Sequence, residues 1–97
     1  MTGTARSSDG LDPRRRRALF RAWHRGTREM DLLLGRFADA YIGDLSDTDL
    51  AAFEALMEVP DRDLFAWVTG SEAVAANYRT PLYRAIVAFH TAPNPSP

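Results

Sequence analysis

The chain has 97 residues and a formal net charge of −1, and 45% of its residues are hydrophobic, which predicts one domain with its own core. It contains no cysteine, which excludes disulfides, thiol catalysis and thiolate metal sites, and its two histidines lie too far apart to suggest a metal site. No apolar run approaches the roughly 20 residues of a membrane helix, and residues 1–12 lack the apolar stretch of a secretory signal. We therefore expect a soluble protein of a reducing compartment.

Charge is unevenly distributed along the sequence. Residues 1–29 contain eight arginines against three acids, whereas residues 30–64 contain nine acids against two arginines. This polarity favours electrostatic steering onto a charged partner surface, and nucleic acid is one alternative partner. The sequence pI of about 6.1 argues against a dedicated nucleic-acid binder, for which a pI above ~9 and exposed stacking aromatics are typical.

The N-terminal part of the sequence predicts a disordered segment followed by a helix. Residues 1–11 are small and polar, so we expect them to stay disordered and outside the core. Asp12 is then a helix N-cap, and Pro13 takes the first helical position, where its missing N–H costs nothing. This helix is expected to continue to about residue 25, with an apolar stripe formed by Leu19, Phe20 and Trp23. Another face carries arginines at three- and four-residue spacing: Arg14, Arg17, Arg21, Arg25 and Arg28.

A second, longer helix follows a glycine. Gly26 is expected to end the first helix, because glycine adopts a left-handed backbone conformation without steric cost. Thr27 caps the next helix, which spans residues 28–42 and ends at Gly43. Its apolar positions recur at helical spacing over more than three turns: Met30, Leu33, Leu34, Phe37 and Tyr41.

Three shorter helices complete the prediction. Ser46 caps the third helix, which runs until Pro60. Asp61 caps a fourth helix that Gly70 ends, and a Thr-Pro pair at residues 80–81 starts the fifth. Their apolar stripes comprise Phe53, Leu56, Met57, Leu64, Phe65, Trp67, Val68, Leu82, Ile86 and Phe89.

The expected fold is all-α. No segment alternates with the period of a strand, and each helix is too short to be stable without tertiary packing. We expect a single small five-helix bundle with short connections over residues 12–92. The disordered residues 1–11 precede it, and a Pro-rich tail at residues 93–97 follows it.

The most informative stretch of the chain is Arg25-Gly26-Thr27-Arg28-Glu29, with Asp31 two positions beyond it. Both acids fall in the first turn of a predicted helix, where two residues that lie two positions apart do not face each other. No nucleophile or metal-ligand cluster lies beside them in sequence, so the pattern does not indicate acid–base catalysis. Two roles stay open. Either the acids complement the helix dipole while Glu29 contacts Arg25, or both acids point outward to bind a partner.

This stretch resembles the R-G-x-x-E signature of the SdhE family of FAD assembly factors, also called succinate dehydrogenase assembly factor 2. Two further segments carry the resemblance. Residues 32–37 (Leu-Leu-Leu-Gly-Arg-Phe) are similar to the family's D-L-L-L-x-x-F continuation, and residues 61–67 (Asp-Arg-Asp-Leu-Phe-Ala-Trp) to its D-x-D-L-[FY]-x-W segment. Thr27 departs from the apolar residue that is frequent at its position, and the last helix matches loosely. The resemblance spans residues 15–89.

The resemblance implies an assembly chaperone and not an enzyme. Family members promote covalent attachment of FAD to the flavoprotein subunit of succinate dehydrogenase and, in some bacteria, of fumarate reductase. It implies that Arg25, Gly26 and Glu29, with Asp31 beside them, bind this client. It also implies that the chain has no cofactor of its own and acts on the FAD of the client.

We accordingly expect a bacterial cytoplasmic protein that is a monomer when free, without nucleic-acid binding or membrane insertion. Two alternatives stay open. One is a small basic-faced nucleic-acid-binding or antitoxin-like regulatory module, whose affinity would fall steeply with salt. The other is an enzyme acting on flavin, which would turn over without a client protein.

Overall fold

The computed structural model describes residues 10–91, which form five α-helices and two short 3₁₀ turns. The α-helices are α1 (Pro13–Trp23), α2 (Arg28–Tyr41), α3 (Asp47–Met57), α4 (Asp61–Thr69) and α5 (Pro81–Thr91). The turns are η1 (Ile42–Asp44) and η2 (Ala76–Tyr78). No strand occurs between residues 10 and 91, so the predicted all-α fold is confirmed. The predictions for residues 1–9 and 92–97 fall outside the described residues.

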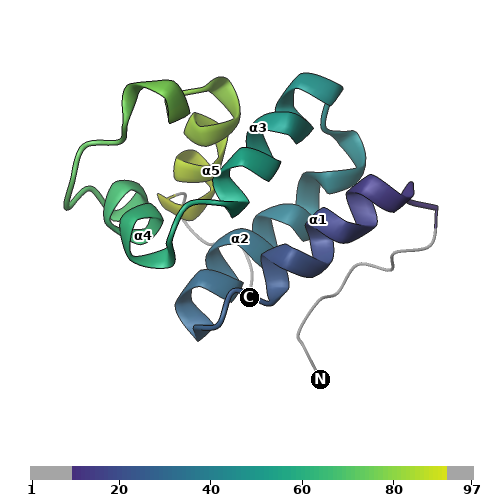
Figure 1. The fold of residues 1–97 in the computed structure, drawn as a ribbon, viewed down its shortest axis with the longest axis horizontal. Coiled ribbons are helices and arrows are strands. Elements are labelled where there is room, and N and C mark those ends of the chain that lie inside the picture. The colour runs from purple at the N-terminus through teal and green to yellow at the C-terminus, as the bar shows by residue number, and fades with distance from the viewer. Residues whose placement is uncertain (1–9, 92–97) are drawn as a thin grey trace.

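The helices pack as two groups that share α3. Helices α1 and α2 lie side by side, while α4 packs against α5 on the other side of the molecule (Figure 1). Between the groups, α3 contacts both α1 and α5, and α2 also contacts α5. Within the described part of the chain, no helix is long and apolar enough to cross a membrane.

Local sequence signals set most of the helix starts. The side chains of four predicted caps each accept a hydrogen bond from the backbone N–H three residues further on, at 3.0–3.2 Å: Asp12, Thr27, Ser46 and Thr80. Gly70, with φ of 88°, ends α4 as predicted. The predicted cap of α4 is wrong, because Pro60 occupies the N-cap and Asp61 is the first helical residue. The Asp61 carboxylate is turned toward Arg25 instead of toward the helix backbone.

The first helix is shorter than predicted. It ends at Trp23, and the C-cap is His24, whose N–H donates to the Arg21 carbonyl. Gly26 has the predicted positive φ, at 111°, but it lies in the connection between α1 and α2 and does not end a helix. The second helix ends at Tyr41, and η1 follows it.

The hydrophobic core receives residues from all five α-helices, but three aromatic residues predicted to lie in it are exposed. These are Phe20 at 62%, Tyr41 at 44% and Phe65 at 39% relative exposure. Trp67 and Phe89 lie at the core margin, where they are half-buried. The predicted aromatic stripes were therefore only partly correct.

Small residues explain the position of Phe20. The buried arc of α1 consists of Ala18, Leu19, Ala22 and Trp23, and Phe20 falls outside that arc. The two alanines are buried although they are small. Leu11 is also buried, at 7% exposure, so the prediction that residues 1–11 stay outside the core is wrong at this position.

Trp23 of α1 packs directly over Gly35 of α2. A Cβ atom at Gly35 would overlap the indole ring, so only glycine fits this position without movement of the ring. The indole Nε1–H donates a hydrogen bond of 3.1 Å to Asp39 on the same helix as Gly35. This contact fixes how α1 lies on α2, and with it the point where the α1–α2 connection begins.

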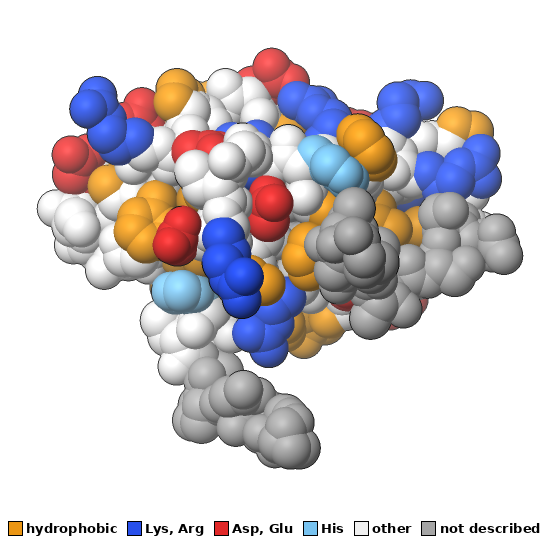
Figure 2. All heavy atoms as spheres, turned by 90° about the horizontal axis from the view of Figure 1, so that it is seen from below, with side chains coloured by type: hydrophobic (Ala, Val, Ile, Leu, Met, Phe, Trp, Pro, Cys, Tyr) orange, Lys and Arg blue, Asp and Glu red, His pale blue; other side chains and the backbone are white. Residues whose placement is uncertain are grey.

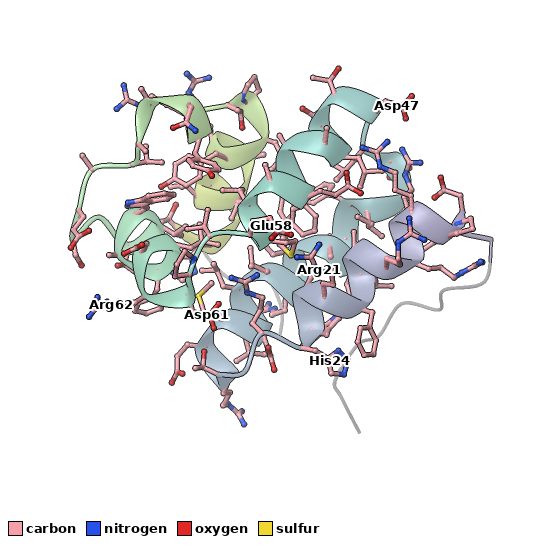
Figure 3. The ribbon with its side chains drawn as sticks, in the orientation of Figure 1. Arg21, His24, Asp47, Glu58, Asp61 and Arg62 are labelled. Atoms are coloured by element: carbon pink, nitrogen blue, oxygen red, sulfur yellow. The ribbon has the colours of Figure 1, made fainter. Side chains whose placement is uncertain are left out.

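Part of the arginine stripe of α1 pairs with acids of the same chain. Arg14 bonds Glu54 at 2.7 Å, and Arg21 bonds Glu58 at 2.6 Å. Figure 3 shows the labelled Arg21 and Glu58 side chains pointing toward one another from α1 and the end of α3. Hydrogen bonds from Arg14 lower the pKa of Glu54. The charge polarity of the sequence is therefore partly neutralised inside the fold.

Candidate partner-binding site at the α1–α2 connection

The connection between α1 and α2 is held by the side chain of Arg25, which is only 9% exposed. Its three nitrogens donate to the Met57 carbonyl at 2.6 Å, the Val59 carbonyl at 2.7 Å and the Asp61 carboxylate at 2.8 Å. The Met57 carbonyl lies at the C-terminal end of α3 and the Val59 carbonyl in the α3–α4 connection, where backbone acceptors have no partner within a helix. The planar guanidinium, with five N–H donors, suits this set of acceptors. We call these contacts the Arg25 clamp.

Asp31 binds the backbone of Arg25, whereas the other contacts of the clamp involve its side chain. Its carboxylate accepts a hydrogen bond of 2.7 Å from the backbone N–H of Arg25. The alternative in which Glu29 contacts Arg25 is therefore wrong, because Asp61 binds the guanidinium and Asp31 binds the backbone. The alternative in which both acids point outward is also wrong for Asp31, which is half-buried.

Gly26 and Glu29 are exposed. A Cβ at Gly26 would meet no atom within 4 Å, so glycine is required there by the positive φ and not by a lack of space. The Glu29 side chain makes no hydrogen bond or ion pair with any residue between positions 10 and 91. The four predicted site residues thus divide into two that hold the connection and two that face solvent.

A groove of about 530 Å³ lies beside Glu29, between the start of α2 and the start of α4. The residues that line this α2–α4 groove are Thr27, Glu29, Met30, Asp61, Arg62 and Phe65. Figure 3 shows Asp61 pointing toward the α1–α2 connection, whereas Arg62 points away from the body of the molecule. The Arg25 clamp joins the two connections that precede α2 and α4, so it sets the spacing of the groove walls.

The groove combines apolar and charged groups. Phe65 supplies exposed apolar surface next to the buried Met30, and Glu29 and Arg62 supply opposite charges. An apolar surface with a polar rim is typical of a site that receives a protein segment. No group of three or more histidine, aspartate or glutamate side chains in the described residues could hold a metal ion. The groove is therefore a candidate binding site for a protein segment.

Sequence reasoning did not assign Phe65 or Arg62 to the site. Both belong to the segment quoted for the family resemblance, but Phe65 was interpreted as a core residue. A signal was present in the helical spacing, since Leu64 and Val68 lie four positions apart and already form the buried stripe of α4. Phe65 lies about 100° around the helix from Leu64 and is therefore an apolar residue in excess of that stripe.

Comparison with known proteins provides independent evidence about the family of the chain. Residues 16–90 match a family described as the flavinator of succinate dehydrogenase. A protein named FAD assembly factor SdhE from Acetobacter pasteurianus is 38% identical over 81 residues, which cover 84% of this chain and 74% of that protein. No solved structure matches significantly.

Mitochondrial proteins named succinate dehydrogenase assembly factor 2 are also similar. Those of Debaryomyces hansenii and Yarrowia lipolytica are 36% and 33% identical, over 66% and 71% of this chain. The matched regions cover 45% and 48% of those two proteins, so this chain spans about half the length of these mitochondrial relatives.

Proposed function

Because the chain belongs to the family described as the flavinator of succinate dehydrogenase, we propose that it promotes covalent attachment of FAD to the flavoprotein subunit of that enzyme. The chain binds this subunit as a client, with the α2–α4 groove and Glu29 forming the contact surface. In this role it is an assembly factor and not an enzyme, and it has no cofactor of its own.

The observation that carries the proposal is the environment of Glu29. Its carboxylate is exposed and has no partner among the described residues, and it lies at an apolar groove. The backbone before Glu29 is nevertheless held in place, because the Arg25 clamp fixes the preceding connection. A binding surface on a fixed backbone loses less freedom on binding than one on a mobile segment.

The four residues of the predicted site have different tasks in this proposal. Arg25 and Asp31 hold the connection in shape, and Gly26 provides its positive φ. Glu29 contacts the client directly. Loss of Arg25 would therefore reduce binding by releasing the groove, whereas loss of Glu29 would remove a contact.

The chain contributes affinity and orientation rather than a reacting group. A binding protein shifts its client toward a conformation only by binding that conformation more tightly than the others. Alignment of reacting groups lowers the barrier because rotational and translational freedom has been lost beforehand. The reacting groups themselves belong to the flavin and to the client.

The test uses the purified apo flavoprotein subunit, FAD and the full chain. We expect covalent flavin on the subunit, detected by its fluorescence after denaturing electrophoresis, to form faster with the chain present. Glu29→Ala should weaken binding by about tenfold or more, which corresponds to loss of one hydrogen bond to a charged group. Its free energy of unfolding should fall by at most about 0.3–1 kcal/mol, the contribution of an acid in the first helical turn.

Glu72→Ala is the matched control, because it removes an exposed carboxylate from the α4–α5 connection. It should bind the subunit like the unaltered chain. Unchanged client affinity in Glu29→Ala, combined with a lowered melting temperature, would reduce Glu29 to a dipole partner of α2. The flavoprotein subunit of fumarate reductase, assayed in parallel, tests whether the client range is wider.

A further inference from the structure

The outer face of α1 carries a second exposed surface, which does not include the Arg25 clamp. Phe20 is 62% exposed, the highest value among the large hydrophobic residues that are exposed. A hollow of about 450 Å³ surrounds it. The residues that line the hollow are Pro13, Arg16, Arg17, Phe20 and Arg21. We call this surface, together with His24, the Phe20 patch.

His24 holds the Phe20 ring in place. The two rings stack with centroids 3.9 Å apart and planes inclined by 17°. The His24 Nδ1 lies 2.7 Å from the Phe20 carbonyl oxygen, and a carbonyl can only accept, so Nδ1 carries the proton of this hydrogen bond. Figure 2 shows a face of the molecule on which histidine and basic side chains lie among exposed hydrophobic ones. The exposed ring is therefore supported rather than free to rotate.

Two of the three arginines around the ring have hydrogen-bond or ion-pair partners among the described residues, and the third has none. Arg16 donates to the Leu11 carbonyl and Arg21 pairs with Glu58. Arg17 is exposed and makes no hydrogen bond or ion pair with a described residue. An exposed apolar centre with a basic rim is complementary to an apolar side chain flanked by carboxylates, which arginine binds through two parallel hydrogen bonds.

We propose that the Phe20 patch binds an acidic segment of the client flavoprotein subunit that carries an apolar side chain. This inference rests on the proposed function, since it adds a second contact to the same partner. The patch is continuous with the first site along the chain, because His24 directly precedes Arg25. The client would thus contact both the α2–α4 groove and the outer face of α1.

Two other occupants fit the patch less well. Nucleic-acid affinity grows with the number of phosphates that are neutralised, and two of the three arginines already have partners inside the chain. A membrane surface would receive a single phenylalanine, and even one whole acyl chain gives only marginal membrane binding. A protein segment needs only one apolar anchor and a complementary charge.

The test is a titration of the purified apo flavoprotein subunit with the full chain at low and high salt. Phe20→Ala should weaken binding by about tenfold or more, as expected for an aromatic anchor. Arg17→Glu should weaken it by about tenfold and reduce its dependence on salt. Phe20→Leu keeps an apolar side chain and Arg17→Lys keeps the charge, so both should retain most of the affinity.

Arg84→Glu on α5 is the matched charge control. Arg84 is exposed on α5, a helix that packs against α2, α3 and α4. The Arg84→Glu variant should therefore bind the subunit like the unaltered chain. If Phe20→Ala and Arg17→Glu bind normally while Glu29→Ala does not, the patch proposal is wrong and the proposed function stands. If the unaltered chain does not bind the subunit, both are wrong. Loss of duplex DNA or anionic vesicle binding in Arg17→Glu, with normal binding to the subunit, would also overturn the proposal.

Discussion

Arg25, at the centre of the buried clamp, and Glu29, beside the exposed groove, lie within five residues of sequence but depend on different physics. Arg25 is almost fully buried and donates to three groups that lie more than 30 positions away. Glu29 is exposed and bonds no described residue. One short motif therefore contains a part that maintains the structure and a part that is available to a partner. Substitutions in the two parts should be distinguishable by stability measurements.

The largest effect is expected from Arg25→Ala. It leaves two carbonyls and the partly buried Asp61 carboxylate without their donor, so the free energy of unfolding should fall by about 2–4 kcal/mol. Chemical denaturation monitored by circular dichroism measures this change. Arg62→Ala, which removes an exposed arginine one residue from Asp61, should change stability by less than about 0.5 kcal/mol. Equal stability of the two variants would show that the clamp has no structural role.

The next effect concerns the packing that positions the clamp. Gly35→Ala should destabilise the chain by about 1–3 kcal/mol through overlap with Trp23, although alanine is normally favoured over glycine inside helices by about 1 kcal/mol. Thermal unfolding measures the cost. In the double variant with Trp23→Leu the two costs should not add, since the smaller side chain relieves the overlap. Additive costs would contradict direct contact between these residues.

Two substitutions at Gly26 distinguish the effect of backbone strain from the effect of a side chain on the contact surface. Gly26→Ala and Gly26→Arg should each lower stability by about 1–2 kcal/mol, because the positive φ is strained for any side chain and no neighbouring atom would be displaced. Client flavinylation should fall further in Gly26→Arg, because the long side chain projects onto the proposed contact surface. The comparison therefore needs both an unfolding curve and a flavinylation assay. Full, equal flavinylation in both variants would contradict it.

The smallest effect is a pH dependence of stability from the Arg14–Glu54 pair, which lies outside the Arg25 clamp and the α2–α4 groove. Arg14 lowers the pKa of Glu54 relative to its usual 4.5, so the stability from this pair is present above that value and is lost as the pH falls through the lower, folded-state pKa. Glu54→Gln should therefore melt slightly below the unaltered chain at pH 7, and the difference should disappear in acid. Both side chains are only half-buried and in contact with water, which keeps this effect below those of the preceding changes. Glu72→Gln should show no such difference.

The sequence was sufficient to predict the fold class and most helix starts, because these depend on local signals. A cap such as Ser46 and the backbone N–H that donates to it lie three residues apart, so both are visible in one short window. The extent of burial was less predictable. On α1 the inward positions include two alanines, and the larger Phe20 was mistaken for a core residue because size was given more weight than angular position.

The candidate site could be predicted only in part for a similar reason. The motif identified the correct segment, but the partners of Arg25 lie 32, 34 and 36 positions away, and no local pattern indicates such contacts. An acid four residues from Arg25 was the obvious partner in sequence. The fold instead places Asp61 beside the guanidinium, because the α3–α4 connection reaches the end of α1.

The positions of the two tryptophans provide each group of helices with its own optical reporter. Trp23 lies in the α1–α2 interface, at 6% exposure, two residues before the clamp. Trp67 lies on α4, with its ring centroid 5.5 Å from that of Tyr78. A Trp67→Phe variant would emit from Trp23 alone, and release of α1 from α2 would shift that emission to longer wavelength as the indole meets water. Client binding could then be followed from the α1 side by fluorescence, without a label.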